Sequence, residues 1–133
     1  MAVTSSKILN LGKNRVAGML VGLNLTQGYT GIGVGEDSTA ANENQSGLIG
    51  SEQSIKPGNV SYFKSTNNSY IAQWNSSWVY GDLTSHVYNE VVVNRSSIGN
   101  TTSEGLLRAV YDSVTLGSGD SLSITAQVAV SEA

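Results

Sequence analysis

The stretch GIGVGEDSTA, residues 31–40, combines closely spaced glycines with acids and hydroxyls, a pattern that can form a phosphate-binding loop. A dinucleotide-binding turn requires G-x-G-x-x-G, and here Glu36 stands where the third glycine belongs. No basic residue follows as a P-loop would require, and the adjacent carboxylates of Glu36 and Asp37 would repel a phosphate. The stretch therefore predicts a strand that runs into an exposed loop.

The histidine and serine residues do not form a recognisable catalytic motif. His86 is the single histidine, which excludes a metal site built from several histidines. It lies in an alternating segment beside Tyr88 and Glu90, where we expect it on a polar or interface face. No serine lies in the G-x-S-x-G motif that exposes a hydrolase nucleophile. We therefore expect no catalytic residue and no enzyme activity.

Acidic residues in the predicted loops carry the oxygen ligands that calcium prefers. They lack the D-x-D-x-D-G order of a dedicated calcium loop; the residues are Glu36, Asp37, Glu43 and Asp120. We therefore expect neither a metal site nor a cofactor.

Two tryptophans, Trp74 and Trp78, fall on the same face of a predicted strand as Tyr70 and Ala72. If exposed, they could form a platform for a carbohydrate. Two tryptophans on one strand more often belong to a core or to the apolar centre of an interface. We favour core or interface, and a carbohydrate-binding module stays open as an alternative.

The composition favours contact with other protein chains. Of the 133 residues, 39% are hydrophobic and only 13% are charged, about half the ~25% typical of soluble domains. Serine, threonine, asparagine, glutamine and glycine replace the missing charge. Burying hydroxyls and amides costs less than burying ions, so such a surface suits stacking against neighbouring chains.

The charge and the cysteine content argue against a nucleic-acid-binding protein and exclude sites built on cysteine. The formal net charge is −3 and the seven lysines and arginines are scattered, whereas nucleic-acid binding needs converging cations. The absence of cysteine excludes disulfides and thiolate metal sites. The apolar run VAGMLVGLNL, residues 16–25, is too short to span a bilayer, and we expect no export signal.

Near the start of the chain, Val16, Met19, Leu20 and Leu23 recur at the spacing of one helix face. This spacing predicts a short amphipathic helix over about residues 13–23. The following segment, 27–34, reads as a strand with Tyr29, Ile32 and Val34 as core candidates.

Residues 35–47 predict a loop, closed by the apolar anchor Leu48 and Ile49, and Pro57 in KPGN predicts a turn. The second half alternates apolar and polar residues over segments 70–80, 83–93, 106–116 and 122–130. The sequence GSGD, residues 117–120, predicts a hairpin between the last two strands.

These elements together predict a mainly β fold, an antiparallel β-sandwich with one short N-terminal α-helix. We expect one domain over residues 1–133, with the sandwich over about residues 27–131.

The order of several short motifs resembles that of small virion structural proteins of tailed phages, namely capsid decoration proteins and tail-fibre attachment domains. The matching segments cover nearly the whole chain: NLGKNRVA (10–17), GIGVG (31–35), DSTAA (37–41), Leu48 with Glu52, VYNEV (87–91), LRAVY (107–111) and GDSLSIT (119–125). Val92 departs from the pattern, because the family usually has glycine there.

This resemblance implies a structural subunit of the virion. It suggests a capsid decoration protein that binds the outer surface of the head, with the major capsid protein or other virion proteins as partners and with copies of itself in a homo-oligomer. A tail, baseplate or tail-fibre attachment subunit is the alternative in the same class. The helix and the loop after residue 35 are the candidate contact elements, and the candidate interface residues are Arg15, Met19, Glu36, Asp37, Asn42, Trp74, Trp78 and His86.

Overall fold

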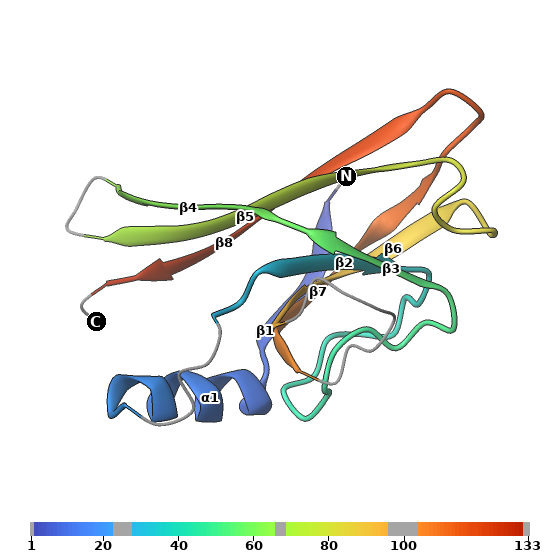
Figure 1. Cartoon of the computed structure of the whole chain (residues 1–133). Helices are drawn as coiled ribbons and strands as arrows, with labels where there is room; N and C mark the ends of the chain where they lie inside the picture. Colours follow the sequence, from blue (N-terminus) through green and yellow to red (C-terminus); the bar gives the residue numbers. More distant parts are fainter. Residues whose placement is uncertain (1, 23–27, 66–68, 96–103, 132–133) are drawn as a thin grey trace.

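The computed structural model describes residues 2–22, 28–65, 69–95 and 104–131. In these residues the chain forms two antiparallel sheets packed as a sandwich, with one short helix near the N-terminus (Figure 1). The predicted mainly β fold is confirmed. The elements are β1 (Val3–Ile8), α1 (Asn10–Leu20), β2 (Gly31–Gly35), β3 (Gln53–Pro57), β4 (Asn59–Lys64), β5 (Tyr70–Val79), β6 (Val87–Asn94), β7 (Gly105–Thr115) and β8 (Ser121–Val130).

The larger sheet has the strand order β1-β7-β6-β2-β3, and the smaller sheet has the order β4-β5-β8. The chain passes from the larger to the smaller sheet at Gly58, whose N–H donates to the Thr30 carbonyl (2.9 Å). It returns through residues 80–86 and crosses again through residues 116–120. Sequence neighbours therefore often face each other across the core instead of pairing.

The predicted hairpin at residues 117–120 is wrong for this reason. β7 and β8 lie in different sheets, and their apolar faces meet in the same core. The turn itself is tight: Gly119 has a φ of +91°, and Gly117 donates its N–H to Asp120 Oδ2 at 2.8 Å. The turn therefore carries the chain from the larger sheet to the smaller one. In this arrangement the apolar faces of β7 and β8 are buried against each other, which would not happen if the two strands paired side by side in one sheet.

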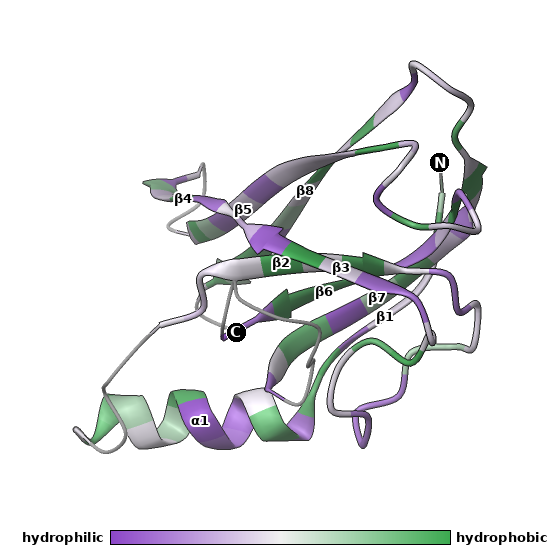
Figure 2. Ribbon diagram, turned by 45° about the vertical axis from the view of Figure 1, so that its right-hand side comes forward, coloured by the Kyte–Doolittle hydropathy of each residue, from purple (hydrophilic) through white to green (hydrophobic). Residues whose placement is uncertain are grey.

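The core between the sheets confirms the alternation predicted for β5 and β8, whereas β7 is buried on both faces from Gly105 to Tyr111. Trp78 is fully buried, and Leu122 and Ile124 of β8 pack in the same cluster. Figure 2 shows the apolar run of β6, which lies in the middle of the larger sheet.

Strand β6 is buried on both faces, which the sequence did not predict. Tyr88 was expected on the polar side with Glu90, yet it packs in the core and donates its hydroxyl to the Val79 carbonyl (2.7 Å). A shift in the β6–β7 register between Tyr88 and Glu90 turns Tyr88 to the core side, while Glu90 points to the other face. That other face is covered by the loop between β2 and β3.

Helix α1 begins three residues earlier than predicted, and the predicted apolar stripe does not face the core. Val16 and Leu20 are exposed, and Leu23 lies outside the described residues. The buried residue of the helix is Gly12, where a Cβ atom would lie 2.7 Å from the Leu106 Cα. The helix is therefore held by the close approach of its first turn to β7.

The first half of the chain also differs in detail from the elements predicted from the sequence. The strand predicted over residues 27–34 begins at Gly31, and residue 27 lies outside the described part. Tyr29 is half-buried against the core. Leu48 is buried above Gly33, but its neighbour Ile49 is exposed. Strands β1, β3 and β4 have no predicted counterpart.

Candidate functional site

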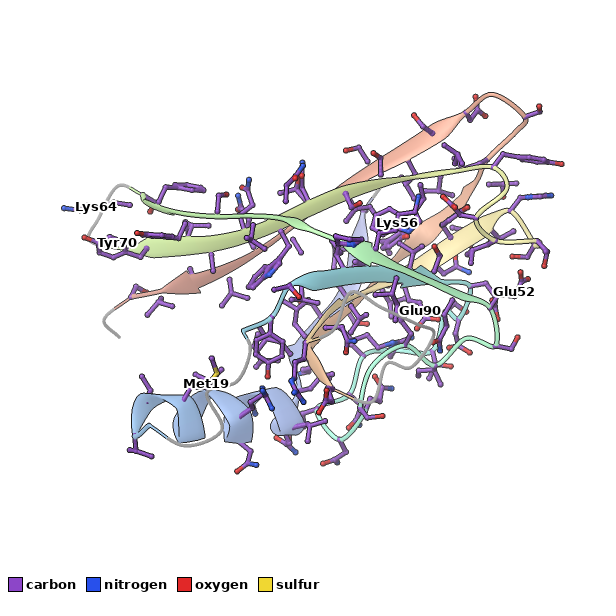
Figure 3. The ribbon with its side chains drawn as sticks, in the orientation of Figure 1. Met19, Glu52, Lys56, Lys64, Tyr70 and Glu90 are labelled. Atoms are coloured by element: carbon purple, nitrogen blue, oxygen red, sulfur yellow. The ribbon has the colours of Figure 1, made fainter. Side chains whose placement is uncertain are left out.

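A buried ion pair lies under the loop of residues 36–52. Arg108 Nε of β7 donates to Glu90 Oε1 of β6 at 3.0 Å, and both side chains are fully buried (Figure 3). Both residues stand on the face of the larger sheet that points away from the smaller sheet. Because each charge is buried, each needs further polar partners.

The loop supplies those partners. Glu90 accepts hydrogen bonds from the backbone N–H groups of Asp37 (3.0 Å), Ile49 (2.8 Å) and Gly50 (2.8 Å). Arg108 donates to the Thr39 carbonyl at 2.8 Å, and its other contacts also lie in the loop. The ion pair is therefore the anchor of the loop, and its groups are committed to structure instead of to a ligand.

Glu36 and Asp37 belong to the same structural arrangement. The Glu36 carboxylate accepts from the backbone N–H groups of Ser51 and Glu52, both at 2.9 Å. Asp37 Oδ1 accepts from the Thr39 N–H at 2.7 Å. The predicted loop is confirmed and begins at residue 36, after β2 ends at Gly35, and both carboxylates accept hydrogen bonds from within the loop. Reversing their charge would break the loop as well as any contact.

Asn42 and His86, two further candidates, lie in separate places. Asn42 is exposed in the loop, where its side-chain oxygen accepts from the Asn44 N–H at 2.8 Å. His86 precedes β6 with a φ of +61°, and its ring stacks on Tyr80 with centroids 3.6 Å apart. The predicted position of His86 on an alternating strand is wrong, because the strand begins only at Val87.

Both tryptophans are core residues. Trp74 exposes 7% of its surface and Trp78 none, and Trp74 Nε1 donates to the Tyr29 carbonyl at 2.7 Å. The core alternative for these two residues is confirmed. An exposed sugar platform made from them is excluded, because their ring faces are covered by the other sheet.

Arg15 and Met19 of α1 are each partly exposed. Arg15 lines a small hollow of about 100 Å³ together with Tyr29, Glu104, Leu11 and Asn14. Met19 is not among its lining residues, so the structure does not join the two candidates in one site.

The smaller sheet carries a surface that the sequence did not point out. Its inner face continues beyond the larger sheet, above α1 in Figure 1. Cross-strand pairs place Val60 opposite Trp74, Tyr62 opposite Ala72 and Tyr70 opposite Val130, all on this one face. We call its uncovered part the overhang, formed by Val60, Tyr62, Tyr70 and Val130.

The overhang is apolar and open. Tyr62 is 84% exposed and Val130 66%, although the same face buries Trp74 further along the sheet. A shallow hollow of about 360 Å³ runs between Tyr62, Val60 and Tyr29. Figure 3 shows Tyr70 and Lys64 at the far end of the sheet, with Met19 on α1 below. The alternation of NVSYFK, residues 59–64, is the sequence signal that would have revealed it.

Other features of a ligand site are sparse in the described part of the chain. There, no group of three or more histidine or acidic side chains gathers in a way that would hold a metal ion. No described helix has the length and apolar character needed to cross a bilayer. Comparison with known proteins yields no matching family model, no matching curated protein and no matching solved structure.

Proposed function

We propose that this chain is a non-enzymatic virion structural protein of a tailed phage, a capsid decoration protein that binds the outer surface of the head. The observation that carries the proposal is the overhang. A face that forms the core at one end of the sheet is left open at the other, with Val60, Tyr62, Tyr70 and Val130 exposed together. Exposed apolar faces of this kind mark contact sites between proteins.

The size of the overhang fits a contact repeated in many copies. A tyrosine side chain carries roughly 150–250 Å² of surface, so Tyr62 and Tyr70 together expose on the order of 300 Å². A stable pairwise interface needs about 800 Å² from each partner. One overhang alone would bind weakly. A symmetric shell that presents many sites to clustered copies would raise the overall affinity without a larger contact.

The helix end adds to this surface. Leu20 is 82% exposed and Val21 72%, and both lie at the end of α1, on the same side of the molecule as the overhang (Figure 1). Together with the overhang they give an apolar centre, while the amides and hydroxyls of the chain give a polar rim. Interfaces between virion subunits need both.

Location on the virion is the first test. Immunogold electron microscopy of phage from the source lysate, with antibody against this chain, should label the head. Label confined to the tail would overturn the decoration proposal in favour of a tail or baseplate subunit. Virions without label would overturn both.

The contact surface is tested separately. Heads that lack the protein are mixed with the purified chain and sedimented. The double variant Val60→Asn/Tyr62→Asn should lose binding at least tenfold and keep its melting temperature, because both side chains are already exposed. Val79→Asn, at a 51% exposed valine outside the overhang, is the matched control and should bind as the wild type does. Equal binding by all three proteins would remove the overhang from the proposal.

A further inference from the structure

The side of the sandwich between β1 and β8 is open. β1 is the edge strand of the larger sheet and β8 is the edge strand of the smaller one. Between them lies a groove of about 390 Å³. It is lined by residues of β1, β6, β7 and β8, among them Val3 and Ile8 of β1, Tyr111 of β7 and Ile124 of β8.

The floor of the groove is core surface that the smaller sheet does not reach. Val3 pairs with Tyr111 and Ile8 with Leu107, so these β1 side chains share the face that β7 turns to the core. Nevertheless Val3 is 64% exposed and Ile8 38%. The smaller sheet is too narrow to cover them. A fourth strand beside β8 would lie over this floor.

The edge of β8 is free to accept such a strand. Among the described residues β8 pairs with β5 alone. Its ten residues, SLSITAQVAV, contain no charge and no proline. Proteins normally protect a long edge strand with charges, proline or a bulge, because its unpaired main-chain groups attract another strand.

Tyr111, which lines the groove, has a buried hydroxyl that also lacks a partner in the described part of the chain. Tyr111 is 3% exposed, and its Oη has no hydrogen-bond partner among the described residues. Burial raises the pKa of this hydroxyl well above its usual value, and the nearby Glu90 raises it further. The group therefore stays protonated at neutral pH and can donate to an acceptor. An unpaired buried donor is costly, so a ligand that brings an acceptor is favoured.

We propose that this groove binds an extended segment of a partner protein, which adds as a fourth strand to the free edge of β8. Apolar side chains at every second position of the segment cover Val3 and Ile8, and an oxygen of the segment accepts from Tyr111. Lys7 pairs with Arg108, so its side chain stands on the other face of β1, and the side chains that meet the segment on this strand are those of Val3 and Ile8. This mode is strand addition, in which main-chain hydrogen bonds give affinity and alternate side chains give specificity.

A single segment fits better than a second intact copy of this chain. In another copy the free edge of β8 is flanked by that copy's own β1. Pairing two such edges would bring β1 of one copy against β1 of the other. A free segment meets no such obstacle. This surface is distinct from the overhang, so the inference extends beyond the proposed function and does not depend on it.

The test uses a capped, fluorescein-labelled peptide with the sequence TVTVEVTVT. Its four valines alternate, so all of them lie on one face of the strand and can cover Val3 and Ile8. The control peptide VVTTETTVV has the same composition without the alternation. Fluorescence anisotropy should show saturable binding of the first peptide and at least tenfold weaker binding of the second. Hydrogen exchange should slow in β8, residues 121–130, when the first peptide is bound.

Variants locate the binding. Val3→Asn should weaken binding of the peptide at least tenfold, and Tyr111→Phe should weaken it roughly three- to tenfold, the range expected for one lost hydrogen bond. Val79→Asn is the matched control and should bind unchanged. Equal affinity for the two peptides, no binding of either at millimolar concentration, affinity unaffected by Val3→Asn, or exchange protection outside β8 would each overturn the proposal. Val3 is already exposed, so its variant is expected to fold.

Discussion

Arg108 Nε lies 3.0 Å from Glu90 Oε1 in the middle of the larger sheet, and neither side chain reaches solvent. Around this pair the loop of residues 36–52 arranges three backbone N–H groups toward Glu90 and two carbonyl groups toward Arg108. The second layer on this face of the sheet is thus an irregular loop held by charge-assisted hydrogen bonds.

We predict that Glu90→Gln destabilises the protein strongly. It removes the buried counter-ion of Arg108 and leaves only the partly exposed Asp37 carboxylate, 3.8 Å away, beside that charge. Removing one partner of a buried ion pair typically costs about 3–5 kcal/mol. Urea unfolding measures this change. The double variant Glu90→Gln/Arg108→Met should recover a large part of the loss, because it removes both charges. Lys13→Met breaks the exposed pair with Glu43 and should change the free energy of unfolding by less than about 0.5 kcal/mol. A Glu90→Gln variant as stable as the wild type would contradict the anchoring role.

Glu36 is expected to contribute to stability. Glu36→Ala removes the acceptor for the N–H groups of Ser51 and Glu52, at a cost of about 1–3 kcal/mol. Thermal and urea unfolding both report the effect. Glu43→Ala, in the same loop but exposed, is the control and should change little. An unchanged melting temperature for Glu36→Ala would show that the Glu36 carboxylate does not stabilise the loop.

Acid should destabilise the protein partly through two loop carboxylates. Hydrogen bonds from Thr39 lower the pKa of Asp37 below 3.8, and the Thr39 hydroxyl contributes more than the Thr39 backbone N–H. The hydroxyl of Thr84 has the largest share in lowering the pKa of Glu52 below 4.5. A carboxyl with a lowered folded pKa stabilises the fold above its unfolded value, and this contribution is lost as pH falls through the folded value.

Unfolding in urea at pH 7 and at a series of values below about 4.5 measures this loss. Asp37→Asn and Glu52→Gln should each start less stable at pH 7 and lose less stability on acidification than the wild type. Parallel pH profiles for wild type and both variants would show that neither carboxyl is linked to folding.

Tryptophan fluorescence should report two buried indoles. Because Trp74 is 7% exposed and Trp78 fully buried, we expect blue-shifted emission and weak quenching by acrylamide. In about 6 M guanidinium chloride, where a domain of ordinary stability is unfolded, the emission should shift to the red and quench strongly. Strong quenching of the native protein would contradict the burial and reopen the carbohydrate-binding alternative.

The strands with regular alternation were predictable, and the ones without it were not. β8 buries Leu122, Ile124 and Ala126 in alternation with exposed residues, and β5 buries Trp74 and Trp78 on one face, so a period of two in the sequence marks both strands. β7 was predicted in the right place, although it is buried on both faces from Gly105 to Tyr111. β1, with the sequence VTSSKI, is an edge strand with mostly exposed side chains, and burial imposes no period on it. β4 does alternate in NVSYFK but is exposed along its whole length, so its alternation marks the overhang and not the core.

Strand pairing and site geometry were less accessible to sequence reasoning. A turn with the sequence GSGD can join two strands that pair in one sheet or two strands that face each other across a core. Which of the two forms depends on residues outside the turn, so the turn sequence alone does not predict the pairing. The burial of Glu90 and Arg108 also left no periodic signal, since the loop that covers them is irregular. A glutamate followed by three valines in β6 and an arginine between Leu107 and Ala109 in β7 are the trace that this arrangement leaves in the sequence.

The pairing of Val3 with Tyr111 has a consequence for how the chain acquires its structure. During synthesis β1 cannot pair with its neighbour until β7 has been made. Contacts between such distant residues close large loops and place a β protein among slow folders, in the range of milliseconds to seconds. Folding of the larger sheet therefore cannot be completed before β7 has been made, and until then β1 has no strand to pair with.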